Sequence, residues 1–289
     1  MRGKWNTLVG AGALTVSLLC RATSAEAQAG QQGQPPSQQQ PPADKDKQPN
    51  PAPLSMDNAP AASPEEDSAS KAVQQATDPN KRIQLAEEFL QKYPQSRYRG
   101  AMYQALVSGY FATQQVPKML DAGEKEVALN PNDAPVLAVM GQALARTYNA
   151  KAPDAAKQLD KAEQYSKRAI EITPTLTKPE NLTDEAFSNA KNDTLVMAHS
   201  GLGLVYIRRQ KFSEAIPELE QSVKADSHPD PDPVNYYLLG VADKQTSHFE
   251  AAAAAFSKCA TVQSTLQATC KSGAEDAKKQ GSTQLSAPN

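Results

Sequence analysis

The groups that could do chemistry in this chain are few and scattered. It has three histidines, of which only His228 stands among carboxylates, in the run Asp226-Ser227-His228-Pro229-Asp230-Pro231-Asp232-Pro233. Imidazole and carboxylate together could bind a metal. The prolines favour an extended chain, however, and a calcium loop would need a glycine and a distal glutamate. We therefore interpret this run as a linker, and His199 and His248 as packing or surface residues.

Other constellations also point away from catalysis. The adjacent acids Glu65-Glu66-Asp67 and Glu87-Glu88 lie in predicted helices, where neighbouring side chains diverge instead of meeting on one substrate. Gly201-Leu202-Gly203 hints at a dinucleotide loop, but no strand precedes it. Gly-x-Ser-x-Gly, Walker and His-Glu-x-x-His motifs do not occur. We predict that the protein is not an enzyme and has no catalytic residue, cofactor, metal or small-molecule substrate.

Composition and charge favour a protein partner over a polyanion. The 289 residues carry a formal net charge of -2. The densest basic run, Arg208-Arg209-Gln210-Lys211, is too short to predict nucleic-acid binding. Mean hydropathy is -0.59, which is polar for a compact globule but ordinary for a solenoid or for a chain with a long disordered segment.

The N-terminus has the pattern of an export signal. Positive charge at Arg2 and Lys4 precedes an apolar run from Leu8 to Leu19. Ala25-Glu26-Ala27 then offers a cleavage site, and Ala27-Gln28-Ala29 offers a competing one. We predict a signal peptide over residues 1–27 and an exported protein, periplasmic or secreted from a bacterial cell envelope.

Two alternatives place the chain on a membrane. The apolar run is shorter than the roughly 20 residues that a membrane-spanning helix needs, which disfavours an anchor. Cys20 could carry a lipid, although bulky Leu19 precedes it and Arg21 follows it. We therefore expect membrane contact only if Cys20 is lipidated.

The next segment changes composition sharply. Residues 28–62 are rich in proline and glutamine, as in Gln34-Pro35-Pro36-Ser37-Gln38, and hold almost nothing to bury. We predict a disordered linker with polyproline character. If the signal is cleaved, we expect this segment to be a free N-terminal tail; if Cys20 is lipidated, we expect it to be a tether above a membrane.

Helix signals begin at Ser63. Ser63-Pro64-Glu65-Glu66 combines a capping hydroxyl, a proline at the first helical position and a capping-box glutamate. Asp78-Pro79 begins a second helix, which ends at Tyr93-Pro94. These signals predict an N-terminal helical pair over residues 63–96. Strand signals are absent throughout, so we predict an all-α fold.

A spacing of large and small residues then recurs. His199-x2-Leu202-Gly203-x2-Tyr206 is followed by Ala215-x3-Leu219. Tyr236-x2-Leu239-Gly240 is followed by Ala252-x3-Phe256, and Leu239 comes 37 positions after Leu202. A helix pair that cannot bury its own apolar face needs such residues at fixed offsets to stack on a copy of itself.

Two earlier copies are weaker. Tyr103-x2-Leu106-Val107-x2-Tyr110 precedes Leu137-x2-Met140-Gly141-x2-Leu144 by 34 positions, but Leu202 comes 62 positions after Met140. We assign the excess to inserts at 149–156 and 175–193, the second holding a short helix that begins at Thr183. Met119 and Gly123 depart from the pattern, so we expect looser helix packing there.

This spacing resembles the tetratricopeptide-repeat (TPR) family over residues 97–264, with residues 63–96 as a degenerate repeat. The resemblance implies a right-handed helical solenoid. Residues 265–281 would form the polar capping helix that solenoids need, and residues 282–289 a disordered tail. The repeat-packing residues are Tyr103, Leu106, Tyr110, Leu202, Gly203, Tyr206, Ala215, Leu239, Gly240 and Ala252.

Two cysteines remain after signal removal. Cys259 and Cys270 form a disulfide in an oxidising compartment, or else stay as buried free thiols. A disulfide would join the capping helix to the last repeat.

The family lines its concave groove with the first helix of each repeat, which implies that a peptide or a partner helix binds there. The matching residues here are Gln104, Ser108, Phe111, Gln142, Arg146, Ser200, Leu204, Ile207, Arg208, Tyr237, Val241 and Lys244. They lack the Lys/Asn clamp of chaperone-binding relatives. The predicted role is a protein-interaction scaffold. The alternative is a structural subunit of an envelope complex that docks through its convex face.

Overall fold

The computed structural model describes residues 61–180 and 182–285. Within them the chain forms eleven α-helices, one short 3-10 turn and no strand, which confirms the all-α prediction. The predicted signal peptide and nearly all of the predicted linker lie outside the described residues. Among the described helices, none has both the length and the apolar character needed to cross a bilayer.

The first helical pair begins where its capping residues predict. Helix α1 (Pro64–Gln75) starts with a complete capping box, in which the Glu66 amide donates to Ser63 Oγ and the Ser63 amide donates to Glu66 Oε2, both at 3.2 Å. Helix α2 (Pro79–Lys92) starts at Asp78, whose Oδ1 accepts the Lys81 amide at 2.8 Å. These bonds satisfy backbone donors that the first turn of a helix leaves unpaired.

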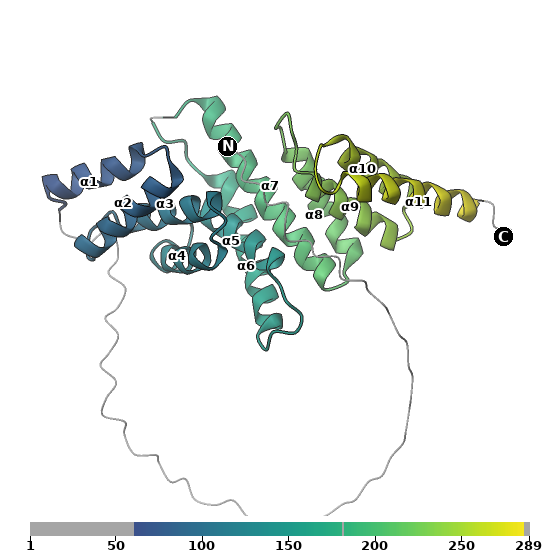
Figure 1. Cartoon of the computed structure of the whole chain (residues 1–289), viewed down its shortest axis with the longest axis horizontal. Coiled ribbons are helices and arrows are strands. Elements are labelled where there is room, and N and C mark those ends of the chain that lie inside the picture. Colours follow the sequence, from purple (N-terminus) through teal and green to yellow (C-terminus); the bar gives the residue numbers. More distant parts are fainter. Residues whose placement is uncertain (1–60, 181, 286–289) are drawn as a thin grey trace, which may run out of the picture.

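Four further hairpins and a final helix follow in one elongated array (Figure 1). The hairpins are α3 (Arg99–Ala112) with α4 (Val116–Leu129), α5 (Ala134–Arg146) with α6 (Ala155–Ile172), α7 (Asp184–Arg208) with α8 (Phe212–Ala225), and α9 (Pro233–Gln245) with α10 (Phe249–Thr261). The 3-10 turn Thr173–Thr175 follows α6, and α11 (Gln267–Leu285) closes the array.

Three of these hairpins share one turn. Gln114, Gln210 and Ser247 all have φ near 60°, in the left-handed region. In each turn the next residue donates its amide five positions back, Lys211 to the Tyr206 carbonyl and His248 to the Asp243 carbonyl at 2.8 Å, and Gln115 to the Tyr110 carbonyl at 2.9 Å. The hairpins α3–α4, α7–α8 and α9–α10 are therefore structural copies of one unit.

Close approach within two of these copies, α7–α8 and α9–α10, depends on glycine. A Cβ atom added to Gly203 would lie 2.6 Å from Leu219 Cγ, and one added to Gly240 would lie 2.8 Å from the Phe256 ring. A large residue of the second helix thus fills the space that the glycine of the first helix leaves, which explains the spacing found in the sequence.

Helix α4 packs less extensively on α3 than the second helices of the other three hairpins of the array pack on their partners, as we expected, but its departures from the repeat pattern leave no gap. Met119 is fully buried. At Gly123 the absent side chain is replaced by Met140 of the next hairpin, whose Sδ would lie 2.2 Å from an added Cβ. Methionine is long and flexible enough to fill an irregular gap, so the departure from the repeat pattern is compensated by a neighbouring helix.

Helix α7 also differs from the prediction. It begins after Thr183 as expected, with the Ala186 amide donating to Thr183 Oγ1 at 3.1 Å, but it then continues for 25 residues without a break. No proline or glycine stands between Asp184 and Gly201 to end a helix. The predicted short helix is therefore the first part of α7, which projects at the top of the array (Figure 1).

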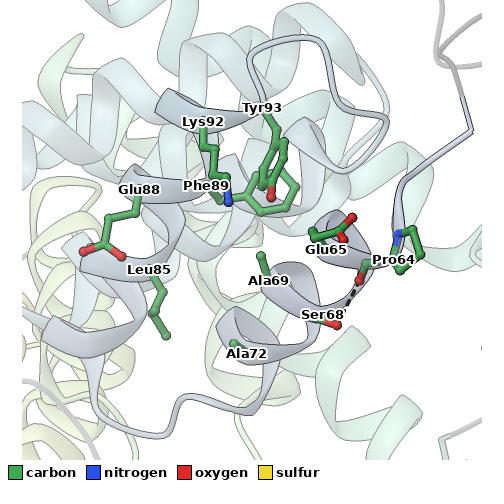
Figure 2. Close-up of a pocket in the computed structure, with 10 residues that line it drawn as sticks. All are labelled: Pro64, Glu65, Ser68, Ala69, Ala72, Leu85, Glu88, Phe89, Lys92 and Tyr93. Carbon is green, nitrogen blue, oxygen red and sulfur yellow. Dashed lines mark hydrogen bonds between the residues drawn. The ribbon is translucent and has the colours of Figure 1, made fainter.

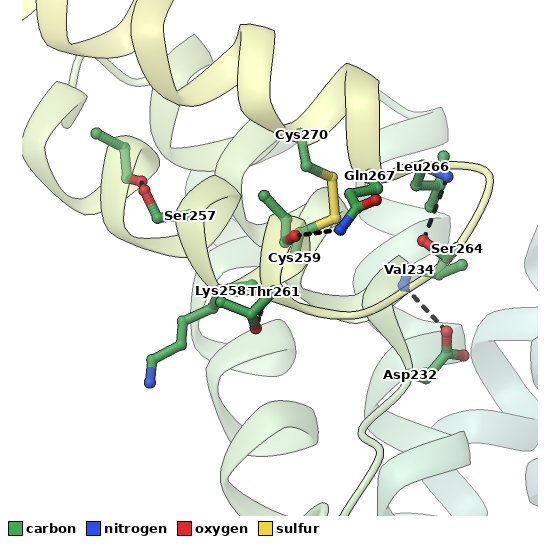
Figure 3. Close-up of a disulfide and its surroundings, with 12 residues drawn as sticks. Asp232, Val234, Ser257, Lys258, Cys259, Thr261, Ser264, Leu266, Gln267 and Cys270 are labelled. Atoms are coloured by element: carbon green, nitrogen blue, oxygen red, sulfur yellow. Dashed lines mark hydrogen bonds between the residues drawn. A yellow bond between two sulfur atoms is a disulfide. The ribbon is translucent and has the colours of Figure 1, made fainter.

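Helix α11 covers the last hairpin. A disulfide joins Cys259 of α10 to Cys270 of α11, with their Cα atoms 5.8 Å apart (Figure 3). Beside it, Gln267 donates Nε2 to the Ala260 carbonyl at 3.1 Å. Cys270, Ala274 and Ala277 face inward and are buried. The helix extends to Leu285, so residues 282–285, which we expected in a disordered tail, belong to the cap.

The glycine contacts give a first prediction. A Cβ atom at Gly201 would lie 2.9 Å from the Gln142 backbone nitrogen and 2.8 Å from Ser166 Oγ, so α5 and α7 would have to separate. Overpacking of this kind costs about 1–3 kcal/mol, and we expect Gly201→Ala to lower the free energy of unfolding by that amount in urea titration. Gly281→Ala, which would approach only Phe249 Cβ at 3.3 Å, is the matched control and should change stability by less than about 1 kcal/mol. An equal effect of the two substitutions would contradict close packing of α5 on α7.

Candidate functional site

The predicted groove residues lie on α3, α5, α7 and α9, the first helices of the four hairpins. We call the side of the molecule that they occupy the first-helix face. Helix α7 packs against both α5 and α9, so this face is continuous from α5 to α9.

In the middle of the first-helix face, side-chain contacts join α5, α7 and α9 to one another. Ser200 Oγ of α7 donates to Asn235 Oδ1 of α9 at 2.6 Å, and both residues are buried. Arg146 near the end of α5 forms an ion pair with Asp232, the N-cap residue of α9, at 3.1 Å. These contacts join three first helices into one rigid unit.

The packing of α5, α7 and α9 buries some of the predicted groove residues, which reduces the number that can contact a partner. Gln142, Ser200 and Leu204 are buried, so their side chains contact neighbouring helices and not solvent. These side chains are buried because α7 packs closely between α5 and α9. Gly201 and Ser200 are small enough to let the helix axes approach.

The ends of the face are more open. Gln104 and Ser108 on α3 are exposed, and Gln104 donates Nε2 to Asp133 Oδ2 at 2.5 Å. Tyr237 and Val241 on α9 are half-buried, and the Tyr237 ring packs at 6.0 Å from that of Phe256. Phe111 of α3 and Ile207 of α7 are half-buried against the two larger apolar cores.

An exposed cation lies over an aromatic ring at the C-terminal end of α7. The Arg208 guanidinium lies 5.9 Å from the centre of the Tyr148 ring. Within the described residues no ion pair joins Arg208 to a carboxylate, whereas Lys244 pairs with Asp276 of α11. Arg146, Arg208 and Lys244 each stand in the last turn of their helix, where the macrodipole favours positive charge.

Tyr148 was not among the residues predicted from the sequence. It lies just after α5, at the edge of the insert before α6, where a repeat motif assigns no role. Its proximity to Arg208, a residue distant in the sequence, depends on how α7 packs against α5. Only the aromatic character of a residue beside an insert could have drawn attention to it.

The titratable groups of the described residues are dispersed. His199 pairs with Glu218 and His228 with Asp193, each at 2.7 Å, while His248 lies 3.8 Å from Asp243. Burial raises the pKa of Asp243 to about 6, although His248 opposes the shift. Within the described residues no three His, Cys, Asp or Glu side chains are grouped as a metal site would require.

Two open depressions lie at the N-terminal end of the array. One, of about 500 Å³, lies between α1 and α2, with Ala69 and Leu85 on opposite walls and charged side chains at its rim (Figure 2). The other, of about 460 Å³, lies among α2, α3 and α4. There Lys118 and Lys125 lie over the rings of Tyr110 and Tyr103. The sequence analysis predicted neither depression.

The buried contact between α7 and α9 leads to a second prediction. Ser200→Ala would leave Asn235 Oδ1 without its donor inside the protein, which costs about 1–3 kcal/mol. We expect a loss of unfolding free energy in that range, measured by chemical denaturation. Ser108→Ala, on the same face but exposed, should leave stability unchanged. If Ser200→Ala were also neutral, the bond between the two first helices would not exist in solution.

No protein-family model matches the chain, and neither does any curated protein sequence. Two solved structures with a similar arrangement are described as tetratricopeptide-repeat proteins. TTC0263 from Thermus thermophilus is 17% identical with a TM-score of 0.46, over 74% of this chain and 99% of that one. A protein from Parabacteroides merdae ATCC 43184 is 13% identical with a TM-score of 0.28, over 74% and 98%. The spacing of residues within its own hairpins, and the turn that three of them share, make the chain a helical-repeat protein, with a residue spacing that resembles that of tetratricopeptide repeats.

Proposed function

We propose that the protein is a scaffold that binds a peptide segment or a helix of a partner protein on its first-helix face. One observation carries the proposal: Arg208 is exposed and lies over Tyr148 at the C-terminal end of α7, beside residues of the face that are buried and bonded to one another. Arginine and tyrosine are among the residues that most often dominate binding energy at protein interfaces.

The rigidity of the face supports this role. A partner that binds a preorganised surface does not have to order it first, so less of the interaction energy is lost. The Ser200–Asn235 and Arg146–Asp232 contacts supply this order across α5, α7 and α9. Arg208 can donate several hydrogen bonds in one plane, which suits a carboxylate or backbone carbonyls of the partner.

A structural role through another surface is the alternative. The two depressions on α1–α4 favour it, since apolar side chains such as Leu85 and Leu106 line their walls. In this case the chain would dock as a subunit of a larger complex, with α1–α4 at the contact.

A photo-crosslinking amino acid at Ser108 tests the first-helix face in the native cell. We expect it to capture a discrete partner, and we expect Arg208→Ala or Tyr148→Ala to reduce the yield about tenfold, the effect of a loss near 1.4 kcal/mol. Lys258→Ala, an exposed change on α10, is the control and should leave the yield intact. If a crosslinker at Leu85 captures the partner instead, or if Arg208→Ala has no effect, the partner binds elsewhere.

We also propose that the protein is exported. Two observations support this: the signal-like pattern of residues 1–27, and the disulfide between Cys259 and Cys270, a kind of bond that persists in oxidising compartments.

The intact mass of the mature protein tests export and disulfide together. We expect a chain that begins at Gln28 or Gly30, after cleavage following Ala27 or Ala29, and a mass about two hydrogens lower without reductant than with it. An added acyl mass on Cys20 would support lipidation. A mature chain that keeps residues 2–25 without a lipid would contradict cleavage.

A further inference from the structure

Two buried acids face each other where α4 meets α5. Glu126 lies in the last turn of α4 and is 1% exposed, and Asp133, the N-cap residue of α5, is 7% exposed. The turn between these helices spans only Asn130–Asp133. This interface is the smallest between any two consecutive hairpins, because α5 packs mainly on α6 and α7.

The two acids differ in their hydrogen bonds. Asp133 Oδ1 accepts the Val136 amide at 3.1 Å, and Asp133 Oδ2 accepts Gln104 Nε2 at 2.5 Å, so both Asp133 oxygens have a donor. Within the part of the chain that the structure describes, Glu126 Oε2 is buried and has no hydrogen-bond partner. A charged oxygen in that position would be costly, which favours a protonated Glu126.

Among the described residues, no cation balances the pair. The basic groups that α6 brings to this joint are engaged elsewhere: Lys161 pairs with Glu124 at 2.7 Å, and Arg168 pairs with Glu171 at 2.8 Å and donates to Asn132. Tyr165 of α6 donates its hydroxyl to Glu124. From α3 the facing group is the neutral amide of Gln104.

These surroundings raise the pKa of Glu126. Burial first, and then the charge of Asp133, raise the pKa of Glu126 to about 8, while a hydrogen bond from Asn130 opposes the shift. An unfolded glutamate titrates near pH 4.3, so the folded joint holds a proton that the unfolded chain would release. The stability of the joint therefore falls as pH rises from about 4.3 to about 8.

We propose that protonation of Glu126 stabilises the contact of α4 with α5, and that ionisation of Glu126 loosens this joint and shifts α1–α4 relative to α5–α11. Ionisation would place a charge near Asp133 in a buried site that the described cations do not reach. Apolar contacts also join the two helices, including Met140 of α5 in the gap at Gly123 of α4, so we expect a displacement within a packed interface and not a full separation.

The joint is coupled to the first-helix face through Gln104. This exposed residue of the face is bonded directly to Asp133, so a displacement at the joint would strain that bond and shift α3 relative to α5. The protonation state of Glu126 would thereby change the geometry of the first-helix face, although Glu126 itself would not contact a partner. The inference concerns the free protein and does not depend on the proposed function.

Distances between spin labels test the joint. One pair, on cysteines introduced at Lys81 and Ser213, spans it, and a second pair, at Ser213 and Lys258, lies wholly in α8–α10. Cys20 is replaced by serine, and Cys259 and Cys270 are already paired. Measurements at about pH 6 and about pH 9.5 bracket the titration of Glu126. We expect the Lys81–Ser213 distribution to shift or broaden at high pH, with a midpoint near 8 in a full titration, and the Ser213–Lys258 distribution to stay constant.

Two variants test whether Glu126 causes the change in the Lys81–Ser213 distance with pH. Glu126→Gln keeps a donor for Asp133 and has no proton to lose, so its Lys81–Ser213 distances should not respond to pH. Asp121→Asn, which removes an exposed carboxylate of the same helix, should respond like the unmodified protein. Circular dichroism shows whether each variant is folded. Equal distances at both pH values in the unmodified chain, or a full response in Glu126→Gln, would overturn the proposal.

Discussion

The structure depends on one constraint: a pair of short amphipathic helices cannot bury its apolar faces alone and must stack on further pairs. Within two hairpins a glycine of the first helix faces a bulky residue of the second, as at Gly203 with Leu219 and Gly240 with Phe256. Between hairpins, glycine again lets helices approach closely: Gly123 of α4 faces Met140 of α5, and Gly201 of α7 faces Gln142 of α5. Helix α11 then covers the last hairpin with its inner face, and the disulfide fastens it there.

An extended array leaves much surface free, and the first helices differ in how they use it. Around α7 they bond to one another through Ser200, Asn235, Arg146 and Asp232, while Arg208 faces solvent over the half-buried Tyr148 ring. The proposed binding and the observed contacts between first helices thus share one face. At the other junction, between α4 and α5, two buried acids lie close to each other in the sequence, Glu126 and Asp133. The bonded part of the face and the part that we propose to respond to pH are therefore adjacent.

The starts of several helices were predictable from the sequence because each depends on residues only a few positions apart. Ser63, Asp78 and Thr183 cap helices where their side chains can reach backbone amides three positions on. The repeat spacing identified the hairpins for the same reason. Contacts between distant segments were not predictable: Arg146 and Asp232 lie 86 positions apart, and nothing near either residue specifies the other. The groove candidates therefore included Ser200 and Leu204, which packing between helices buries.

The stacking of equivalent hairpins is tested most directly by nuclear Overhauser effects in the full chain. We expect contacts between hairpins: from the Gly123 α-protons of α4 to the Met140 methyl group of α5, and from the Gly201 α-protons of α7 to the Gln142 α-proton of α5, in the same spectrum as strong helical signals throughout α3–α7. Helical signals without either contact would contradict the stacking, since the hairpins would then exist without the packing that joins one to the next.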